Sequence, residues 1–230
     1  MDVWSTADML IDAHALSRSY RQGGVPISAL ASATFRLHAG DRVALVGRSG
    51  SGKSTLLHLM AGLDVPSSGT ITWPALGPVE NLLPEKIALA FQAPSLLEPM
   101  SVSENVALPL LLAKAGGDID AAVAAALATF GLESLARKLP EELSGGQMQR
   151  VAMARAIVGK PSIILADEPT GQLDQPTGQA LLDALIAHLG GSGTALVVAT
   201  HDPSVAARMN AIWRIERGVL IESAEAREEA

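Results

Sequence analysis

Residues 47–55 read GRSGSGKST. It matches the pattern G-x-x-x-x-G-K-[ST], in which the last two positions open a helix. The apolar run RVALVG at 42–47 leads into it and is typical of a short buried strand, while STLLHLMAGL at 54–63 has the apolar spacing of a helix. The sequence therefore predicts a strand, a glycine-rich loop and a helix in succession.

Such a loop has the chemistry of a phosphate site. Its glycines let successive backbone N–H groups converge on phosphate oxygens, and the following helix adds its positive N-terminal end. Lys53 would reach the β- and γ-phosphates of a nucleotide, and the hydroxyl of Ser54 can ligate Mg²⁺. The alternative is an ordinary glycine turn, which the flanking strand and helix disfavour.

The chain around this loop alternates between strand-like and helix-like segments. Partial apolar alternation at 9–16 and 27–37 indicates a strand-rich N-terminal part. Further on, the apolar runs at 162–167 and 194–200 read as strands separated by a helical segment at 176–190. This alternation predicts an α/β fold with a parallel core.

Two more helices are expected between these parts. Residues 118–139 are rich in Ala and Leu, with Asp118 or Asp120 as a cap, and residues 148–159 form a second helix that Pro161 would stop. The tail 223–230 is acidic and is expected to be a solvated end.

Composition narrows the classes of function. At 230 residues the chain fits one large domain or two small ones, and it has no cysteine, so no disulfide is expected. Its formal charge of −7 lacks the basic excess typical of nucleic-acid binders. The N-terminus does not read as a secretory signal, and every apolar run is shorter than the roughly 18–20 residues of a membrane helix. Any membrane role is therefore expected to come through a partner.

A carboxylate pair follows the run SIILADE. Asp167 ends an expected buried strand and Glu168 follows it, at the edge where parallel strands converge on a ligand. Asp167 can hold Mg²⁺ or its waters while Glu168 polarises an attacking water. The simpler alternative is two acids that solvate a strand end.

A second glycine-rich stretch, LSGGQ, occupies 143–147 ahead of the expected helix at 148–159. Its N–H groups and the helix dipole would make a second anion-binding end, which one ATP in one subunit does not obviously require. The alternative is a serine-capped helix start whose glycines serve as a turn.

With LSGGQ, the chain resembles the ATP-binding cassette (ABC) ATPases over nearly its whole length. The resemblance implies a P-loop NTPase core with an N-terminal antiparallel β portion and an inserted α-helical subdomain. It also implies that two copies pair head to tail, so that Ser144, Gly145 and Gly146 of one copy meet the γ-phosphate held by the phosphate loop of the other. In this interpretation each site needs both glycine stretches.

The implied domain is single, 1–230, with a nucleotide-binding core at 1–92 and 160–222 and a helical subdomain at 93–159. The resemblance assigns an adenine-stacking ring to Tyr20, a metal and water contact to Gln92, a dimer-crossing role to Asp174 and a γ-phosphate contact to His201. The implied catalytic residues are Glu168, His201 and Gln92, and the implied Mg²⁺ ligands are Ser54, Gln92 and Asp167. The implied ATP-binding residues are Tyr20, Gly47, Arg48, Ser49, Gly50, Ser51, Gly52, Lys53, Ser54, Thr55, Ser144, Gly145, Gly146, Gln147 and Asp174.

ADEPTGQLD at 166–174 and ENVALPL at 104–110 are similar to the cassettes of lipoprotein release, macrolide or peptide export, and cell division. Gln172 departs from the asparagine common there, and the segment before Gln92 lacks the usual basic run. The resemblance implies a membrane permease partner, no nucleic-acid partner, and a place on the cytoplasmic face of the membrane. We expect exposed Leu96, Leu97 and Met100 within 93–103 to form part of the permease-binding groove.

Three alternatives remain open from the sequence. A regulatory cassette would transmit a signal across the membrane without transport. A soluble cassette would act on DNA or ribosomes, although such proteins usually carry a coiled-coil insertion or two cassettes. A G-protein-like or kinase P-loop enzyme would leave LSGGQ without a task. The scattered histidines His14, His38, His58 and His188 do not have the spacing of metal ligands.

Overall fold

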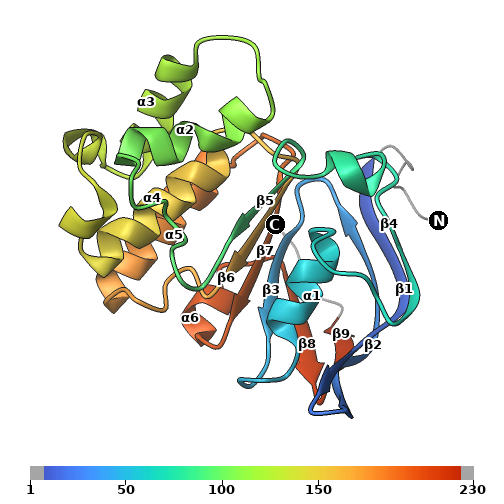
Figure 1. The fold of residues 1–230 in the computed structure, drawn as a ribbon. Coiled ribbons are helices and arrows are strands. Elements are labelled where there is room, and N and C mark those ends of the chain that lie inside the picture. Colours follow the sequence, from blue (N-terminus) through green and yellow to red (C-terminus); the bar gives the residue numbers. More distant parts are fainter. Residues whose placement is uncertain (1–7, 224–230) are drawn as a thin grey trace. The chain divides into compact units, whose positions relative to one another are not determined.

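A computed structural model describes residues 8–223. The described residues form two compact units, the first made of residues 8–82 and 195–223 and the second of Leu83–Thr194. Figure 1 shows the helices and strands of both.

Unit 1 contains most of the strands. Its elements are β1 (Met9–Gln22), β2 (Val25–His38), β3 (Arg42–Val46), α1 (Lys53–Met60), β4 (Ser68–Thr72), the 3₁₀ turn η2 (Val79–Asn81), β7 (Ala195–Thr200), α6 (Pro203–Ala206), β8 (Ala211–Glu216) and β9 (Val219–Ser223). The strands lie in the order β4-β1-β2-β9-β8-β3-β7. β1 pairs antiparallel with β2 and β4, whereas β3 pairs parallel with β7 and β8. The predicted N-terminal strands and parallel core are therefore confirmed.

Local sequence explains this sheet. β1 and β2 are joined by Gly23 and Gly24, both with positive φ (58° and 85°), which is the two-residue turn that suits a twisted hairpin. Towards its end β2 alternates between exposed and buried residues, as expected for a sheet with one wet face, whereas β7 is buried at every position. Phe35 of β2 packs on Trp213 of β8, with ring centroids 4.8 Å apart.

Unit 2 is mainly helical. Its elements are β5 (Ile87–Ala90), α2 (Val102–Leu112), α3 (Ile119–Thr129), the 3₁₀ turns η3 (Glu133–Leu135) and η4 (Pro140–Glu142), α4 (Gly145–Ile157), β6 (Ile163–Asp167) and α5 (Gln175–His188). β5 and β6 pair in parallel. α2, α3 and α4 pack on one another, and α4 also contacts α5, as Figure 1 shows.

Side-chain caps set the helix starts in unit 2. Ser101, Asp118, Ser144 and Asp174 each accept a hydrogen bond from a backbone N–H of the first turn of α2, α3, α4 and α5 respectively. The expected cap at Asp118 is thus confirmed.

The helix expected over 118–139 is shorter than predicted. α3 ends at Thr129, because Gly131 takes a left-handed conformation (φ 63°). The N–H groups of Gly131 and Leu132 bond back to the carbonyls of Ala128 and Leu127, which is the Schellman arrangement that closes a helix. The chain beyond Gly131 continues in turns.

Candidate functional site

The loop between β3 and α1 has the form predicted for a phosphate cradle. Gly50 and Gly52 have φ values of 74° and 109°, which L side chains rarely adopt. A Cβ at Gly52 would collide with the backbone carbonyl of Ala29 in β2, and one at Gly47 would lie 2.6 Å from the carbonyl oxygen of Ile215 in β8. The loop is therefore threaded between two strands at positions where only glycine fits.

The N-terminal end of α1 is open to an anion. The residue that precedes the helix is Gly52, which has no side chain to cap the first turn, and that turn, KSTL, contains no acid. The first N–H groups of a helix have no partner inside it, and together they carry a partial positive charge. This end of α1 is thus suited to phosphate oxygens, and the hydroxyl of exposed Ser54 lies in the same turn.

Lys53 places its charge over the loop. Its side chain is 8% exposed, and its ammonium donates to the carbonyl oxygen of Gly47 at 2.8 Å. This contact holds the ammonium across the loop. A phosphate in the loop would be a stronger acceptor because it is charged.

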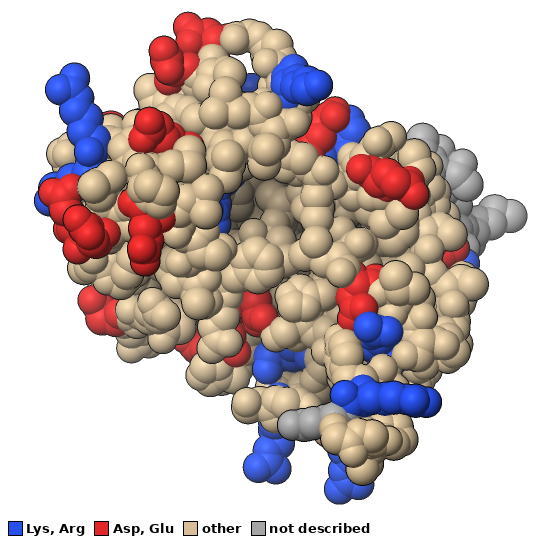
Figure 2. Space-filling model, viewed as in Figure 1, with Lys and Arg blue, Asp and Glu red and all other residues tan. Residues whose placement is uncertain are grey.

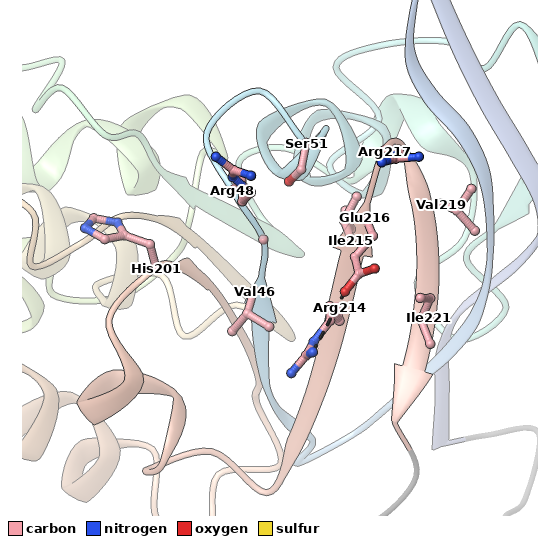
Figure 3. Close-up of a pocket in the computed structure, with 11 residues that line it drawn as sticks. Val46, Arg48, Ser51, His201, Arg214, Ile215, Glu216, Arg217, Val219 and Ile221 are labelled. Carbon is pink, nitrogen blue, oxygen red and sulfur yellow. Dashed lines mark ion pairs between the residues drawn. The ribbon is translucent and has the colours of Figure 1, made fainter.

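A hollow of about 920 Å³ lies beside the loop in unit 1. Figure 3 shows Arg48 and Ser51 entering it from the loop, His201 from the chain after β7, and side chains of the β8–β9 hairpin from the other side. Its described lining residues are Val46, Gly47, Arg48, Ser51, His201, Arg214, Ile215, Glu216, Arg217, Val219 and Ile221. Figure 2 also shows Lys and Arg side chains along the lower edge of the viewed face, over the end of unit 1 that holds this loop.

Strand register brings His201 to the loop. Val46 and Thr200 are paired residues at the ends of the parallel strands β3 and β7. The residues that follow them, Gly47 and His201, therefore leave the sheet at the same edge, where α/β proteins bind ligands. Asp202 then caps α6 through the N–H of Ser204 at 2.8 Å, and the hydrogen bonds from Ser204 lower the pKa of the Asp202 carboxyl.

Tyr20 lies in β1 and is held by two neighbours. Its hydroxyl donates to Asp64 Oδ2 at 2.7 Å, and the guanidinium of Arg18 stands 4.7 Å from the ring centroid while pairing with Asp64 at 2.6 Å. Burial raises the pKa of Asp64, but hydrogen bonds from Tyr20, Val65 and Arg18 outweigh it and lower the pKa. The ring is 39% exposed and is not among the described residues that line the hollow. Its adenine-stacking role stays a prediction.

In unit 2 the carboxylate pair follows β6. Asp167 is buried at the end of the strand, and Glu168 has a left-handed backbone (φ 48°). Such a conformation costs a non-glycine residue about 1–3 kcal/mol and is concentrated at functional sites. Ala90 of β5 pairs with Ala166 of β6, so exposed Gln92 leaves the parallel pair at the same edge as the two acids.

The stretch LSGGQ differs from its prediction. We expected it to precede the helix, but α4 begins at Gly145, so both glycines lie within its first turn. The cause is a capping box. Ser144 Oγ accepts from the N–H of Gln147, and Gln147 Oε1 accepts from the N–H of Ser144 at 2.9 Å. The side chain of Gln147 is therefore engaged in the cap, and the N–H groups of Gly145 and Gly146 point out of the helix start.

The glycines of α4 also allow a close neighbour. A Cβ at Gly146 would lie 2.8 Å from Leu173 Cδ2, and one at Gly145 would lie 3.4 Å from Gln172 Oε1. The residue Gln172, which departs from the resembled subfamily, thus sits against the start of α4. Asp174 next caps α5 through the N–H of Thr177 at 2.9 Å, and hydrogen bonds from Thr177 lower its pKa.

The expected apolar segment 93–103 is only partly exposed. Leu97 is 45% exposed, but Leu96 and Met100 are half-buried, so that part of the prediction is wrong. The contacts that hold this segment come from Asn105 and Arg155, neither of which was singled out from the sequence. No local pattern marks them, because a hydrogen bond of Arg155 spans 60 residues.

These residues suit a magnesium nucleotide. Within unit 1 the loop offers glycine positions that have no room for a Cβ, a lysine ammonium and an exposed hydroxyl, and Mg²⁺ is commonly bound by one or two protein oxygens together with phosphates. Among the described residues there is no cluster of three His, Cys, Asp or Glu that could hold a metal alone. No helix in the described part of the chain is long and apolar enough to span a bilayer.

Comparison with known proteins gives consistent results. The family model described as ABC transporter matches residues 30–171. The lipoprotein-releasing system ATP-binding protein LolD of Chromohalobacter salexigens is 40% identical over 231 residues, covering 94% of this chain and 95% of that protein. The LolD protein of Pseudomonas syringae pv. tomato is 41% identical over 217 residues, covering 90% and 95%.

Solved structures agree with the fold. A dimeric structure of the ATP-binding cassette MJ0796 in a post-hydrolysis state, bound to ADP and Pi, superposes with a TM-score of 0.88 at 31% identity and covers 96% of this chain and 100% of that one. A second dimeric structure of MJ0796, described as a bacterial ABC transporter cassette, gives 0.88 at 32% identity with the same coverage. The α/β fold with a P-loop core predicted from the sequence is thereby confirmed.

Proposed function

The chain belongs to the ABC transporter family and is an ATPase, and from this premise we propose that two copies close head to tail around two ATP molecules to drive separate membrane subunits. The observation that carries the proposal is the presence of two anion-binding helix starts. α1 follows the glycine cradle, and α4 begins at Ser144 with Gly145 and Gly146 in its first turn. Both helix starts have a use if the phosphates of one ATP lie between the start of α1 in one copy and the start of α4 in the other.

The proposed binding roles follow from the chemistry of each group. The N–H groups of the loop and the ammonium of Lys53 hold the β- and γ-phosphates, and His201 contacts the γ-phosphate from the end of β7. Ser54, Asp167 and Gln92 hold Mg²⁺ or its waters. When bound, Mg²⁺ neutralises charge that develops on the bridging and terminal phosphate oxygens. Tyr20 supports the adenine.

Glu168 is the proposed general base. A water oxygen attacks the γ-phosphorus while the carboxylate of Glu168 accepts one of its protons, and the bond between that phosphorus and the β–γ bridging oxygen breaks to release ADP and phosphate. The left-handed backbone of Glu168 supports this role, since it fixes the direction in which the side chain leaves the strand. Ser144 and the first N–H groups of α4, supplied by the other copy, stabilise the charge on the γ-phosphate.

The proposed membrane partner follows from the relatives. Both LolD proteins compared above are named as ATP-binding proteins of a lipoprotein-releasing system. We extend this to the chain as an energy-supplying subunit at the cytoplasmic face of the membrane, bound to a permease near exposed Leu97. The single-domain organisation expected from the sequence, with 93–159 as the helical subdomain, belongs to this proposal.

The test uses Glu168→Gln, which keeps the size of the base but cannot accept the proton. With ATP and Mg²⁺ this variant should accumulate a stable dimer, seen by light scattering, and should capture a stoichiometric multi-span protein from detergent-solubilised membranes. Lys53→Ala, which cannot hold the phosphates, serves as the control and should remain monomeric. Wild-type hydrolysis by Glu168→Gln would refute the base assignment. Capture of soluble partners or nucleic acid alone would refute the membrane role.

A further inference from the structure

The segment 95–101, which contains exposed Leu97, is tied to helix α4. Arg155 Nη1 donates to the carbonyl oxygen of Ser95 at 2.8 Å, and Nη2 donates to Ser95 Oγ at 3.3 Å. The side chain of Arg155 is half-buried, and burial lowers its pKa. A guanidinium that donates twice to one residue forms a directional link.

The same segment is tied to helix α2 by Asn105. This side chain is fully buried, and the two hydrogens of its Nδ2 are shared among the carbonyl oxygens of Leu97, Met100 and Ser101, at N···O distances of 3.1, 2.9 and 3.1 Å. Its Oδ1 accepts from the N–H of Leu97 at 2.8 Å. The segment is therefore a short plate fixed to α4 at one end and to α2 along the rest.

The two ends of α4 serve different surfaces. Arg155 lies in its last turn, and Ser144 caps its first turn. At 1.5 Å per residue the two residues are roughly 16 Å apart along the axis. An α-helix transmits an axial or tilting displacement as a rigid body because each residue is bonded to the next turn. Movement of the plate at Ser95 is thus passed by Arg155 to the helix that presents Gly145 and Gly146.

We propose that Arg155 is a positioning residue that transmits a push on the 95–101 plate to the ATP-contacting start of α4. This inference rests on the proposed function, in which a membrane subunit supplies the push at Leu97 and Ser144 faces the nucleotide of the other copy. In this proposal Arg155 acts through Ser95 and α4 and contacts neither ATP nor the permease. Loss of the Arg155 side chain should leave basal ATP hydrolysis intact but remove its stimulation by the membrane partner.

The chain offers a matched control on the same helix. Arg150 Nη1 donates to the carbonyl oxygen of Phe130 at 3.2 Å, so it anchors α4 to the end of α3 rather than to the plate. Arg155→Met and Arg150→Met each keep an unbranched aliphatic side chain and remove the guanidinium hydrogen-bond donors. Arg155→Lys serves as the conservative variant, because it retains the positive charge but donates from a single nitrogen instead of two.

The first readout is ATPase activity of each variant, alone and in complex with its membrane subunits in nanodiscs. Arg155→Met should keep the rate of the isolated cassette within about two-fold and lose at least five-fold of the partner-dependent stimulation. Arg155→Lys should recover part of it, and Arg150→Met should keep it. Equal losses in both methionine variants would reveal a merely structural role and overturn the inference, as would full stimulation in Arg155→Met.

A second readout needs no partner. Hydrogen exchange of the isolated cassette reports the N–H groups of Gln147 and Met148, which bond to Ser144 Oγ and to the Ser144 carbonyl. Arg155→Met should accelerate exchange in 95–101 and at these two amides, whereas Arg150→Met should leave 95–101 unchanged. Exchange at Gln147 and Met148 identical to wild type would overturn the inference even if no membrane subunit is ever captured. Failure of the wild type to bind or respond to membrane subunits would instead refute the proposed function.

Discussion

Replacing Asn105 with Leu should destabilise unit 2 without creating a large void, because the two side chains are similar in size. The change removes all four hydrogen bonds to the 97–101 backbone. The carbonyls of Leu97 and Ser101 keep a second donor, the N–H groups of Met100 and Asn105. The N–H of Leu97 and the carbonyl of Met100 lose the partner that Asn105 provides.

The magnitude follows from these four bonds. A net hydrogen bond contributes about 0.5–1.5 kcal/mol, and two of the acceptors keep a bond, so we expect a loss of about 3 kcal/mol in the free energy of unfolding. For a chain of this size that corresponds to a fall in Tm of about 6–12 °C.

The assay is urea denaturation followed by circular dichroism, with Asn81→Leu as the control. Asn81 is exposed in η2, and the same chemical change there should alter stability by less than about 0.5 kcal/mol. A loss below about 1 kcal/mol for Asn105→Leu would refute the view that Asn105 holds the plate. Hydrogen exchange should also increase at the amide of Leu97, which donates to Asn105 Oδ1.

Three further changes test the site. Lys53→Ala should weaken ATP binding by more than about 100-fold, since a buried charge that faces the phosphates is lost; titration calorimetry with binding within ten-fold of wild type would contradict this. Gly146→Ala should leave the ATP affinity within about two-fold but slow hydrolysis about ten-fold, or ~1.4 kcal/mol, because its Cβ would displace Leu173; an unchanged rate would show that this contact is dispensable. The pKa of Asp174 is lowered in the folded chain, so its cap on α5 stabilises above the unfolded pKa of about 4 and is lost as the pH falls through the lower folded value. Asp174→Asn should remove that part of the acid sensitivity in pH-dependent melting, and an unaltered pH profile would exclude it.

The parts of this fold that could be predicted are those encoded by neighbours in the chain. The loop at 47–55 identifies its own strand and helix, because the glycines, Lys53 and the apolar flanks are contiguous. Asp118 could be named as a cap for the same reason, since a cap acts on the residues next to it.

Predictions failed where a distant residue or a backbone conformation decides. Ala- and Leu-rich composition extended the helix past Gly131, although that glycine closes α3 through its positive φ. The glycines of LSGGQ were predicted to precede the helix, but the reciprocal hydrogen bonds of Ser144 and Gln147 place them in the first turn of α4. Pairings such as Tyr20 with Asp64 are 44 residues apart and leave no periodic trace. The candidate site residues of each unit could be named from the sequence because their motifs are local, and their roles stay predictions.

The contact between Leu173 and Gly146 connects two parts of one copy, the segment that follows Glu168 and the start of α4. The N–H of Gly171 donates to the carbonyl of Glu168, and the residues that follow Gly171 pack on the start of α4. In the proposed dimer, Glu168 acts on a copy's own ATP while α4 closes on the ATP of the other copy. In that dimer a change at one nucleotide would reach the other through the turn after Glu168 and the side chain of Leu173. The two hydrolysis events are then not independent, and the rate should rise with ATP concentration with a Hill coefficient above one.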